Sequence, residues 1–206
     1  MADWATSSGC KPRPYRSPYG SPMIRHFEES TCASSDVIVR GDVVTGDTVV
    51  TTGGLARVVR APSSGGTGTN VMQVAIKSLI GVALQGSTSD GSTTGFGAAN
   101  GLRGTDKRRY LAVALAAPDQ EFIGYNSTLE TGNGVASQLL IGLNRPLVYD
   151  RTHHTYFVAS TNSTAALAAV SITEFPEGVI GDSGAFPIIF RFLSSNVSPV
   201  VPGATQ

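Results

Sequence analysis

The stretch Ile180-Gly-Asp-Ser-Gly-Ala-Phe-Pro-Ile-Ile-Phe-Arg-Phe-Leu193 decides how the fold of this chain is interpreted. In its second half, large apolar residues recur at every second position, which is typical of a β-strand. The side chains that should point into a core from this strand are Phe186, Ile188, Phe190 and Phe192. The first half, residues 181–184, has two interpretations: a turn that leads into the strand, or a loop that carries a nucleophilic serine.

Two upstream segments, 77–84 and 109–119, alternate in the same way. The large side chains expected to share one face are Ile80, Val82 and Leu84 in the first segment and Leu111, Val113 and Leu115 in the second. In the second segment the opposite face holds only alanines. A face of large side chains fills a core, and a face of small side chains lets another layer approach closely, as in a barrel or sandwich.

The remaining strand candidates are bounded by Gly-Asp corners, prolines and Gly/Ser/Thr stretches. They are expected at 36–40, 43–51, 55–61, 71–76, 122–125, 138–141, 146–150, 155–159 and 168–175. Only 163–169 could form a short helix, and 86–101 is expected to be a long surface loop. The fold class is therefore all-β: a small antiparallel β-barrel or sandwich with an extended N-terminal arm and long Gly/Ser/Thr loops.

Three regions organise the chain: an arm at 1–22, a β-domain at 23–194 and a C-terminal tail at 195–206. Four prolines between Lys11 and Pro22 predict a polyproline-like arm. Aromatic and arginine side chains dominate interface hot spots. The arm residues predicted to contact a partner are Trp4, Arg13, Tyr15, Arg16 and Tyr19. The alternative is a tail that contacts nothing.

Composition excludes several classes of partner. Only 15% of residues are charged, against about 25% in an average soluble chain. Fifteen basic residues balance fifteen acidic ones, so we expect neither nucleic acid nor a membrane as partner. Few charges protect weakly against self-association, which fits a protein that works inside an assembly. Cys10 and Cys32 are interpreted as free thiols.

No cofactor, metal or catalytic residue is expected. The adjacent pair His153 and His154 should face opposite sides of a strand, and no other ligand lies at suitable spacing. The carboxylates Asp119 and Glu121 are interpreted as a solvated turn after Pro118.

The alternative enzyme is a trypsin-like serine hydrolase that uses Ser183. Such a triad needs a histidine and an aspartate that precede the serine with room for a domain half between them. His26 lies before the first confident strand, and His154 lies too close to Ser183. The turn interpretation of residues 181–184 is therefore favoured.

Several segments resemble, in their order, the head decoration (cement) proteins of tailed phages. The resemblance covers residues 21–194. Its motifs are Ser21-Pro-Met-Ile-Arg-His-Phe-Glu-Glu-Ser30, Gly41-Asp42-Val-Val, Ser78-Leu-Ile-Gly-Val-Ala-Leu84, Val113-Ala-Leu-Ala-Ala-Pro-Asp-Gln-Glu-Phe122 and the closing Ile180-Gly-Asp with Phe190-Arg-Phe192. The arm and the 86–106 region look longer than in that family.

The resemblance implies a small β-barrel protein of the virion, located on the outer capsid surface and assembled in the host cytoplasm. It would bridge major capsid subunits without catalysing a reaction. Its partners would be the major capsid protein and copies of itself, as a homotrimer or alternatively a homodimer. A carbohydrate-binding module of a phage fibre or spike is a further alternative.

Overall fold

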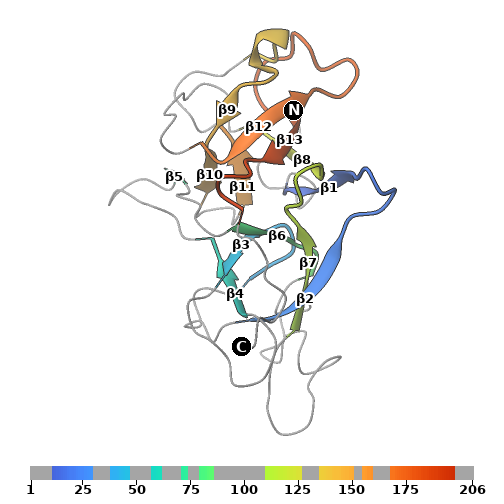
Figure 1. Ribbon diagram of the computed structural model, residues 1–206. Coiled ribbons are helices and arrows are strands. Elements are labelled where there is room, and N and C mark those ends of the chain that lie inside the picture. The colour runs from blue at the N-terminus through green and yellow to red at the C-terminus, as the bar shows by residue number, and fades with distance from the viewer. Residues whose placement is uncertain are drawn as a thin grey trace, which may run out of the picture.

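In a computed structural model of the chain, nearly all the regular elements are β-strands (Figure 1). The residues that it describes are 11–29, 38–46, 57–61, 71–73, 79–85, 110–126, 135–150, 155–159 and 168–197. Within these ranges the fold is all-β, with mainly antiparallel sheets, one short 3-10 helix and no α-helix. The predicted fold class is confirmed.

Five strands pair in a closed ring in the order β2-β4-β3-β6-β7, with β7 pairing back onto β2. All of these pairings are antiparallel except the one between β2 and β4. The ring strands are β2 (Ile24–Glu29), β3 (Val43–Gly46), β4 (Arg57–Arg60), β6 (Leu79–Ala83) and β7 (Tyr110–Leu115). In Figure 1 the ring lies below the other sheets.

A five-stranded antiparallel sheet in the order β1-β8-β13-β12-β9 lies above the ring. Its strands are β1 (Arg13–Arg16), β8 (Glu121–Tyr125), β13 (Pro187–Phe192), β12 (Val170–Glu174) and β9 (Asn144–Arg145). A three-stranded sheet completes the fold in the order β11-β10-β5. Its strands are β11 (Thr155–Val158), β10 (Leu147–Asp150) and β5 (Val71–Gln73).

Two hydrophobic clusters form the core. The smaller cluster takes residues from all five ring strands, and the larger joins both sheets to the outside of the ring. Strand β7 serves both, because its larger residues belong to the ring cluster while Ala114 belongs to the larger one. The predicted small face of β7 is therefore the face that packs against the next layer. The predicted stripe of β13 is also confirmed, since Phe186, Ile188, Phe190 and Phe192 all lie in the larger cluster.

The alternation predicted for β6 is wrong at its first two residues, because Leu79 lies in the larger cluster, away from Ala83. Val82 and Leu84 contribute to the larger cluster, whereas Ile80 lies in the ring cluster. The register opposite β3 shifts at this point, because Val44 pairs with Gly81 while Thr45 pairs with Leu79. A bulge that leaves Ile80 without a register partner on β3 interrupts the period of two and turns its side chain to the other face.

Two predicted strands are corrected. Residues 138–140 form a 3-10 helix, capped by the Ser137 hydroxyl that accepts a hydrogen bond from the Leu139 amide at 3.2 Å. Residues 38–42 form a turn in which the Asp42 carboxylate accepts from the Val39 amide at 2.9 Å. Gly41 takes a positive φ of 89° there, which a strand does not use. Local side-chain hydrogen bonds therefore override the hydrophobic pattern at both places.

Part of the predicted arm belongs to the sheet. Residues 13–16 form β1 and pair with β8, so this segment is an edge strand rather than a polyproline-like extension. At the other end, Val197 bridges to Leu79 of β6. Several predictions fall outside the described residues: those for Trp4, Cys10, Cys32, His153, His154, the 86–101 loop and most of the helix considered at 163–169.

Candidate functional site

Residues 179–182 form a turn that is held by backbone hydrogen bonds, and Ser183 follows it in a bridge to Val135. The Asp182 amide donates to the Val179 carbonyl at 2.9 Å, and the Gly181 amide donates to the Ala136 carbonyl at 2.8 Å. Gly181 and Gly184 both have positive φ values, 97° and 92°. Glycine suits these positions because it carries no Cβ that would be strained there. The backbone geometry thus accounts for both glycines.

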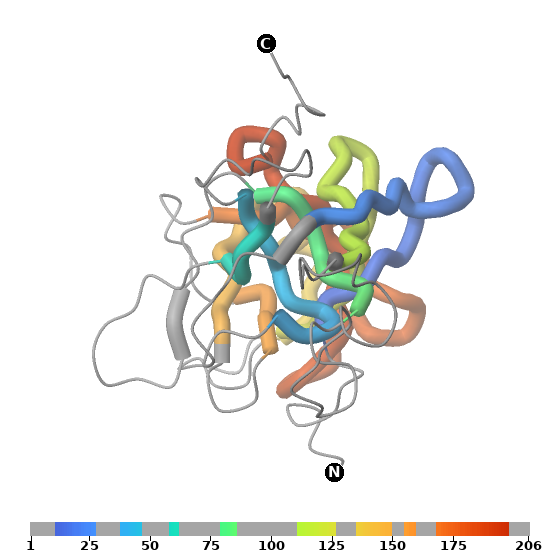
Figure 2. The backbone as a smooth tube through the Cα atoms, turned by 90° about the horizontal axis from the view of Figure 1, so that it is seen from below, coloured from blue at the N-terminus to red at the C-terminus, as the bar shows by residue number. Residues whose placement is uncertain are grey.

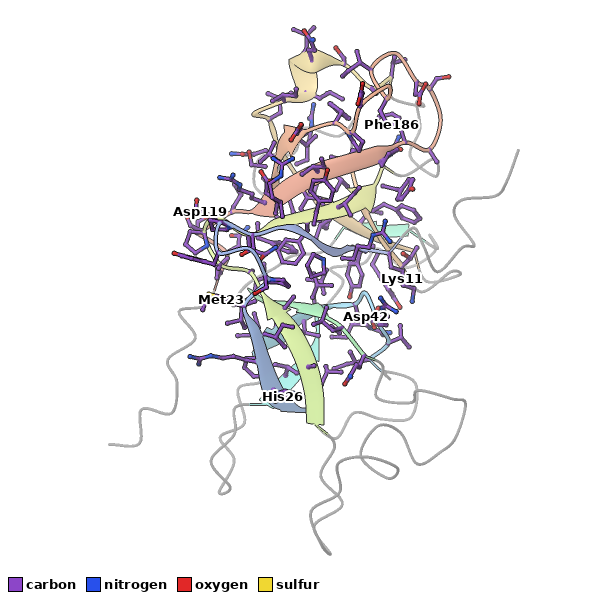
Figure 3. All side chains as sticks on the ribbon, turned by 90° about the vertical axis from the view of Figure 1, so that its right-hand side faces the viewer. Lys11, Met23, His26, Asp42, Asp119 and Phe186 are labelled. Atoms are coloured by element: carbon purple, nitrogen blue, oxygen red, sulfur yellow. The ribbon has the colours of Figure 1, made fainter. Side chains whose placement is uncertain are left out.

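Ser183 is exposed, and His26 lies far from it. Figure 3 places His26 in the ring and Phe186, which follows the turn, at the opposite end of the molecule. His26 is itself exposed on β2. Within the described ranges no histidine stands beside Ser183, and no group of three metal-binding side chains occurs.

Asn126 fastens this turn to β8. Its side-chain amide donates to the Gly184 carbonyl at 2.7 Å, and its carbonyl accepts from the Phe186 amide at 2.6 Å. The residue is fully buried. Sequence reasoning missed this anchor, because an asparagine after a strand is equally typical of an open turn.

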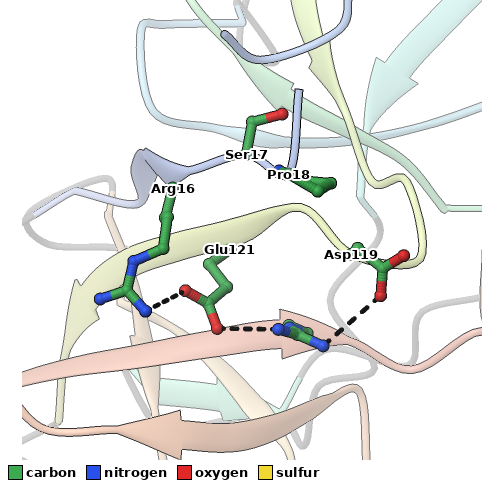
Figure 4. A pocket seen from close by; sticks show the side chains of 6 residues that line it. Arg16, Ser17, Pro18, Asp119 and Glu121 are labelled. Atoms are coloured by element: carbon green, nitrogen blue, oxygen red, sulfur yellow. Dashed lines mark hydrogen bonds and ion pairs between the residues drawn. The ribbon is translucent and has the colours of Figure 1, made fainter. Parts of the chain in front are cut away.

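The arm is fastened to the five-stranded sheet by a row of charged side chains. Arg16 on β1, Glu121 on β8, Arg191 on β13 and Glu174 on β12 come from four strands that are neighbours in the sheet. Arg16 contacts Glu121 at 3.3 Å, and Arg191 contacts the same carboxylate at 3.1 Å (Figure 4). Arg16 also contacts Glu174 at 3.1 Å. Asp119 ends the row at 3.6 Å from Arg191.

Glu121 is the centre of this row and its most buried member. Its side chain is 6% exposed, against 55% for Arg16 and 40% for Arg191. A carboxylate removed from water in this way requires charged partners, and the two guanidinium groups supply them. The interpretation of Glu121 as part of a solvated turn is therefore wrong. The sequence holds no signal for it, since Glu121 meets Arg16 and Arg191 only through strand pairing.

Further contacts hold the arm at its backbone. The buried Gln120 donates from its amide nitrogen to the Arg16 carbonyl at 3.0 Å and to the Glu121 carbonyl at 2.8 Å. Pro12 is buried and lies close to Gly124 of β8. The arm from Pro12 to Arg16 is thus part of the folded domain. A cavity of about 360 Å³ opens beside it, lined by Arg16, Ser17, Pro18, Asp119, Glu121 and Arg191.

A second attachment joins the arm to the ring. The stem of Lys11 packs over Gly41, where a Cβ would lie 2.5 Å from the Lys11 Cβ. Figure 3 shows Lys11 near Asp42. Asp42 is fully buried, and burial raises its pKa to about 7 despite the Val39 amide, Lys11 and Arg60. Burial also lowers the pKa of Lys11, an effect that Asp42 partly offsets.

The predicted contact residues divide between two adjacent surfaces. On the first, which we call the arm face, Arg13 and Tyr15 are exposed and Arg16 is half-exposed, with its guanidinium 5.3 Å from the Tyr15 ring centre. The second, the loop face, consists of Tyr19, Met23, Ile24 and Arg25 in and after the connection between β1 and β2. Figure 2 shows this connection extending away from the body of the molecule.

The loop face is apolar and well anchored. Tyr19 is 77% exposed, and Met23 and Ile24 are 45% and 49% exposed. The connection is closed by a turn in which the Gly20 amide donates to the Ser17 carbonyl at 3.1 Å, and the Met23 carbonyl accepts from Leu115 of β7 at 2.8 Å. Tyr19 was predicted as a contact residue, whereas Met23 and Ile24 were not.

A third surface, the tip face, escaped sequence analysis. It consists of five exposed aliphatic residues: Val135, Leu139, Ile141, Leu143 and Ile180. Their two segments are bonded together, since Val135 bridges to Ser183 and the Ala136 amide donates to the Asp182 carbonyl at 2.8 Å. In Figure 1 both segments lie at the end of the five-stranded sheet away from the ring. The pattern of 138–141 was interpreted as a strand, which hid this exposure.

Comparisons with protein-family models, with curated proteins and with solved structures found no match. Among the described residues no helix is long and apolar enough to cross a membrane.

Proposed function

We propose that this chain is a non-enzymatic decoration protein, which binds the outer surface of a phage head and bridges major capsid subunits. The resemblance in residues 21–194 motivates this function. The observation that best supports it is the arm face, where exposed Arg13 and Tyr15 project from a strand that the buried Glu121 ties to the sheet.

A contact surface of this kind binds with little loss of conformational entropy, because its backbone is ordered before the partner arrives. Aromatic and arginine side chains are also the most common hot spots at protein interfaces. The low charge of the chain and its several exposed apolar residues fit a protein that is covered by neighbours on a shell. Several modest contacts on one particle would add through effective concentration.

The test is co-sedimentation of the purified chain with heads of the phage that encodes it, prepared without their own copy of the protein. We expect the double substitution Arg13→Ala and Tyr15→Ala to weaken binding by about tenfold or more, which corresponds to about 1.4 kcal/mol or more. A matched control is Ser21→Ala, which changes an exposed residue outside the arm face.

Two outcomes would contradict the proposal. One is that the natural chain, the double variant and the control variant all bind heads equally well. The other is covalent labelling of Ser183 by a serine-reactive probe that is lost in Ser183→Ala, because this would favour the hydrolase alternative.

A further inference from the structure

The tip face carries acidic groups at its border. Glu177 and Asp182 are exposed on the segment that supplies Ile180, and neither forms an ion pair with any described residue. The basic side chain within the described part of these two segments, Arg145, is 8% exposed. The tip face is therefore an aliphatic surface with a negative border.

The loop face has the opposite character. Its apolar residues are flanked by Arg25 on β2. The Arg25 guanidinium forms no ion pair within the ranges that the structure describes. The nearby Arg16 and Arg191 are already held by carboxylates and are not free in this way. The loop face is therefore an apolar surface with a positive border.

We infer that the tip face of one copy binds the loop face of a second copy, in a head-to-tail contact. Apolar residues meet apolar residues at the centre of such a contact, and carboxylates meet guanidinium groups at its border. A tip-to-tip contact would instead bring Glu177 and Asp182 against the same residues of the second copy, and like charges at an interface are unfavourable. A loop-to-loop contact would oppose arginines in the same way.

This contact differs from a two-fold dimer in its geometry. Each copy uses two different surfaces, so after one contact each copy of the pair still has a free surface. Association then continues until a ring closes, or else it forms an open chain. The inference deepens the proposed function, since it names a second copy as the partner of Tyr19 and leaves the arm face for the shell.

The experiment measures the mass of the full chain by sedimentation velocity and light scattering, with no capsid present. One variant blocks the tip face with Leu139→Asp and Ile180→Asp, and the other blocks the loop face with Tyr19→Asp and Ile24→Asp. All four residues are exposed, so thermal melts should stay close to that of the natural chain. Gln138→Ala, next to Leu139, is the matched control and should associate normally.

We expect the natural chain to associate as its concentration rises and each variant alone to remain a monomer of about 21.3 kDa. An equimolar mixture of the two variants should form a dimer and nothing larger, because only one intact pair of faces is left. The dissociation constant of that dimer should lie within about tenfold of the natural contact.

Three outcomes would overturn the inference. The natural chain could remain monomeric, the mixed variants could fail to pair, or the loop-blocked variant could still associate through its tip face alone. Because head binding is measured separately with arm-face variants, loss of association and loss of the proposed function can be told apart.

Discussion

The substitution Glu121→Gln tests whether a buried carboxylate holds the arm strand to the sheet. It keeps the size of the side chain and removes the charge that faces Arg16 at 3.3 Å and Arg191 at 3.1 Å. Removing one member of a fully buried ion pair costs about 3–5 kcal/mol, whereas exposed pairs are worth about 0.2–1 kcal/mol. Here the carboxylate is buried but the two guanidinium groups are roughly half-exposed.

The expected cost lies between these limits. Arg16 keeps Glu174 and Arg191 keeps Asp119, and water reaches both guanidinium groups, so the lower part of the range applies. We expect a loss of about 1–2 kcal/mol, concentrated at β1, because among the described strands it pairs only with β8, at the edge of the sheet.

Hydrogen exchange measured by mass spectrometry resolves this effect by segment. A loss of about 1.4 kcal/mol accelerates exchange about tenfold in the peptide that contains β1. Peptides from the centre of β13 should change much less. The control is Asp119→Asn, the same chemical change at a carboxylate that is 65% exposed, which should cost less than about 1 kcal/mol. Equal effects of the two substitutions, or unchanged exchange at β1, would refute the reasoning.

Three other sites give sharp expectations. Burial raises the Asp42 pKa from 3.8 to about 7. Between these two pH values, Asp42 is therefore protonated in the folded state and ionised in the unfolded chain. Stability should therefore fall as the pH rises from about 4 to about 7, by up to about 4 kcal/mol, and the Asp42→Asn variant measured by urea unfolding should lack this part of the pH dependence. Asn126→Ala leaves the Phe186 amide and the Gly184 carbonyl without their partner, and should lower the free energy of unfolding by about 2–3 kcal/mol in the same assay. The control Asn196→Ala loses one half-buried hydrogen bond to Ala168 and should cost clearly less. Gly81→Ala places a Cβ 1.9 Å from the Ala114 carbonyl oxygen and should lower the melting temperature strongly. The control Gly46→Ala places a Cβ 3.9 Å from its nearest neighbouring atom and should leave the melting temperature nearly unchanged. Equal melting temperatures of the two variants would contradict the close packing of β6 on β7.

The sequence was sufficient to predict a strand and its buried face where the hydrophobic pattern follows the period of two without interruption. The stripe of β13 was predicted because apolar residues recur there at every second position, and the small face of β7 because large and small side chains alternate there. The bulge at Ile80 could not be predicted, since it arises from the register between β3 and β6 and leaves no mark in either strand alone.

Polar anchors were the least predictable part of the candidate site. Glu121, Asn126 and Asp42 lie at strand ends or turns, where a solvated residue is the ordinary expectation. Their burial depends on partners such as Arg16 that are distant in the chain. Tyr15 and Tyr19 were identified from residue type alone, and both are exposed. The tip face was missed because Leu139, Ile141 and Leu143 follow a serine cap that replaces the expected strand.

The central claim is that the chain acts by occupying a site on an assembled shell. Electron cryo-microscopy of purified particles from the virus that encodes it tests this claim most directly. The account predicts density of this all-β shape on the outer surface, in contact with at least two neighbouring capsid subunits through the arm face. Mature particles that lack the chain altogether would contradict it.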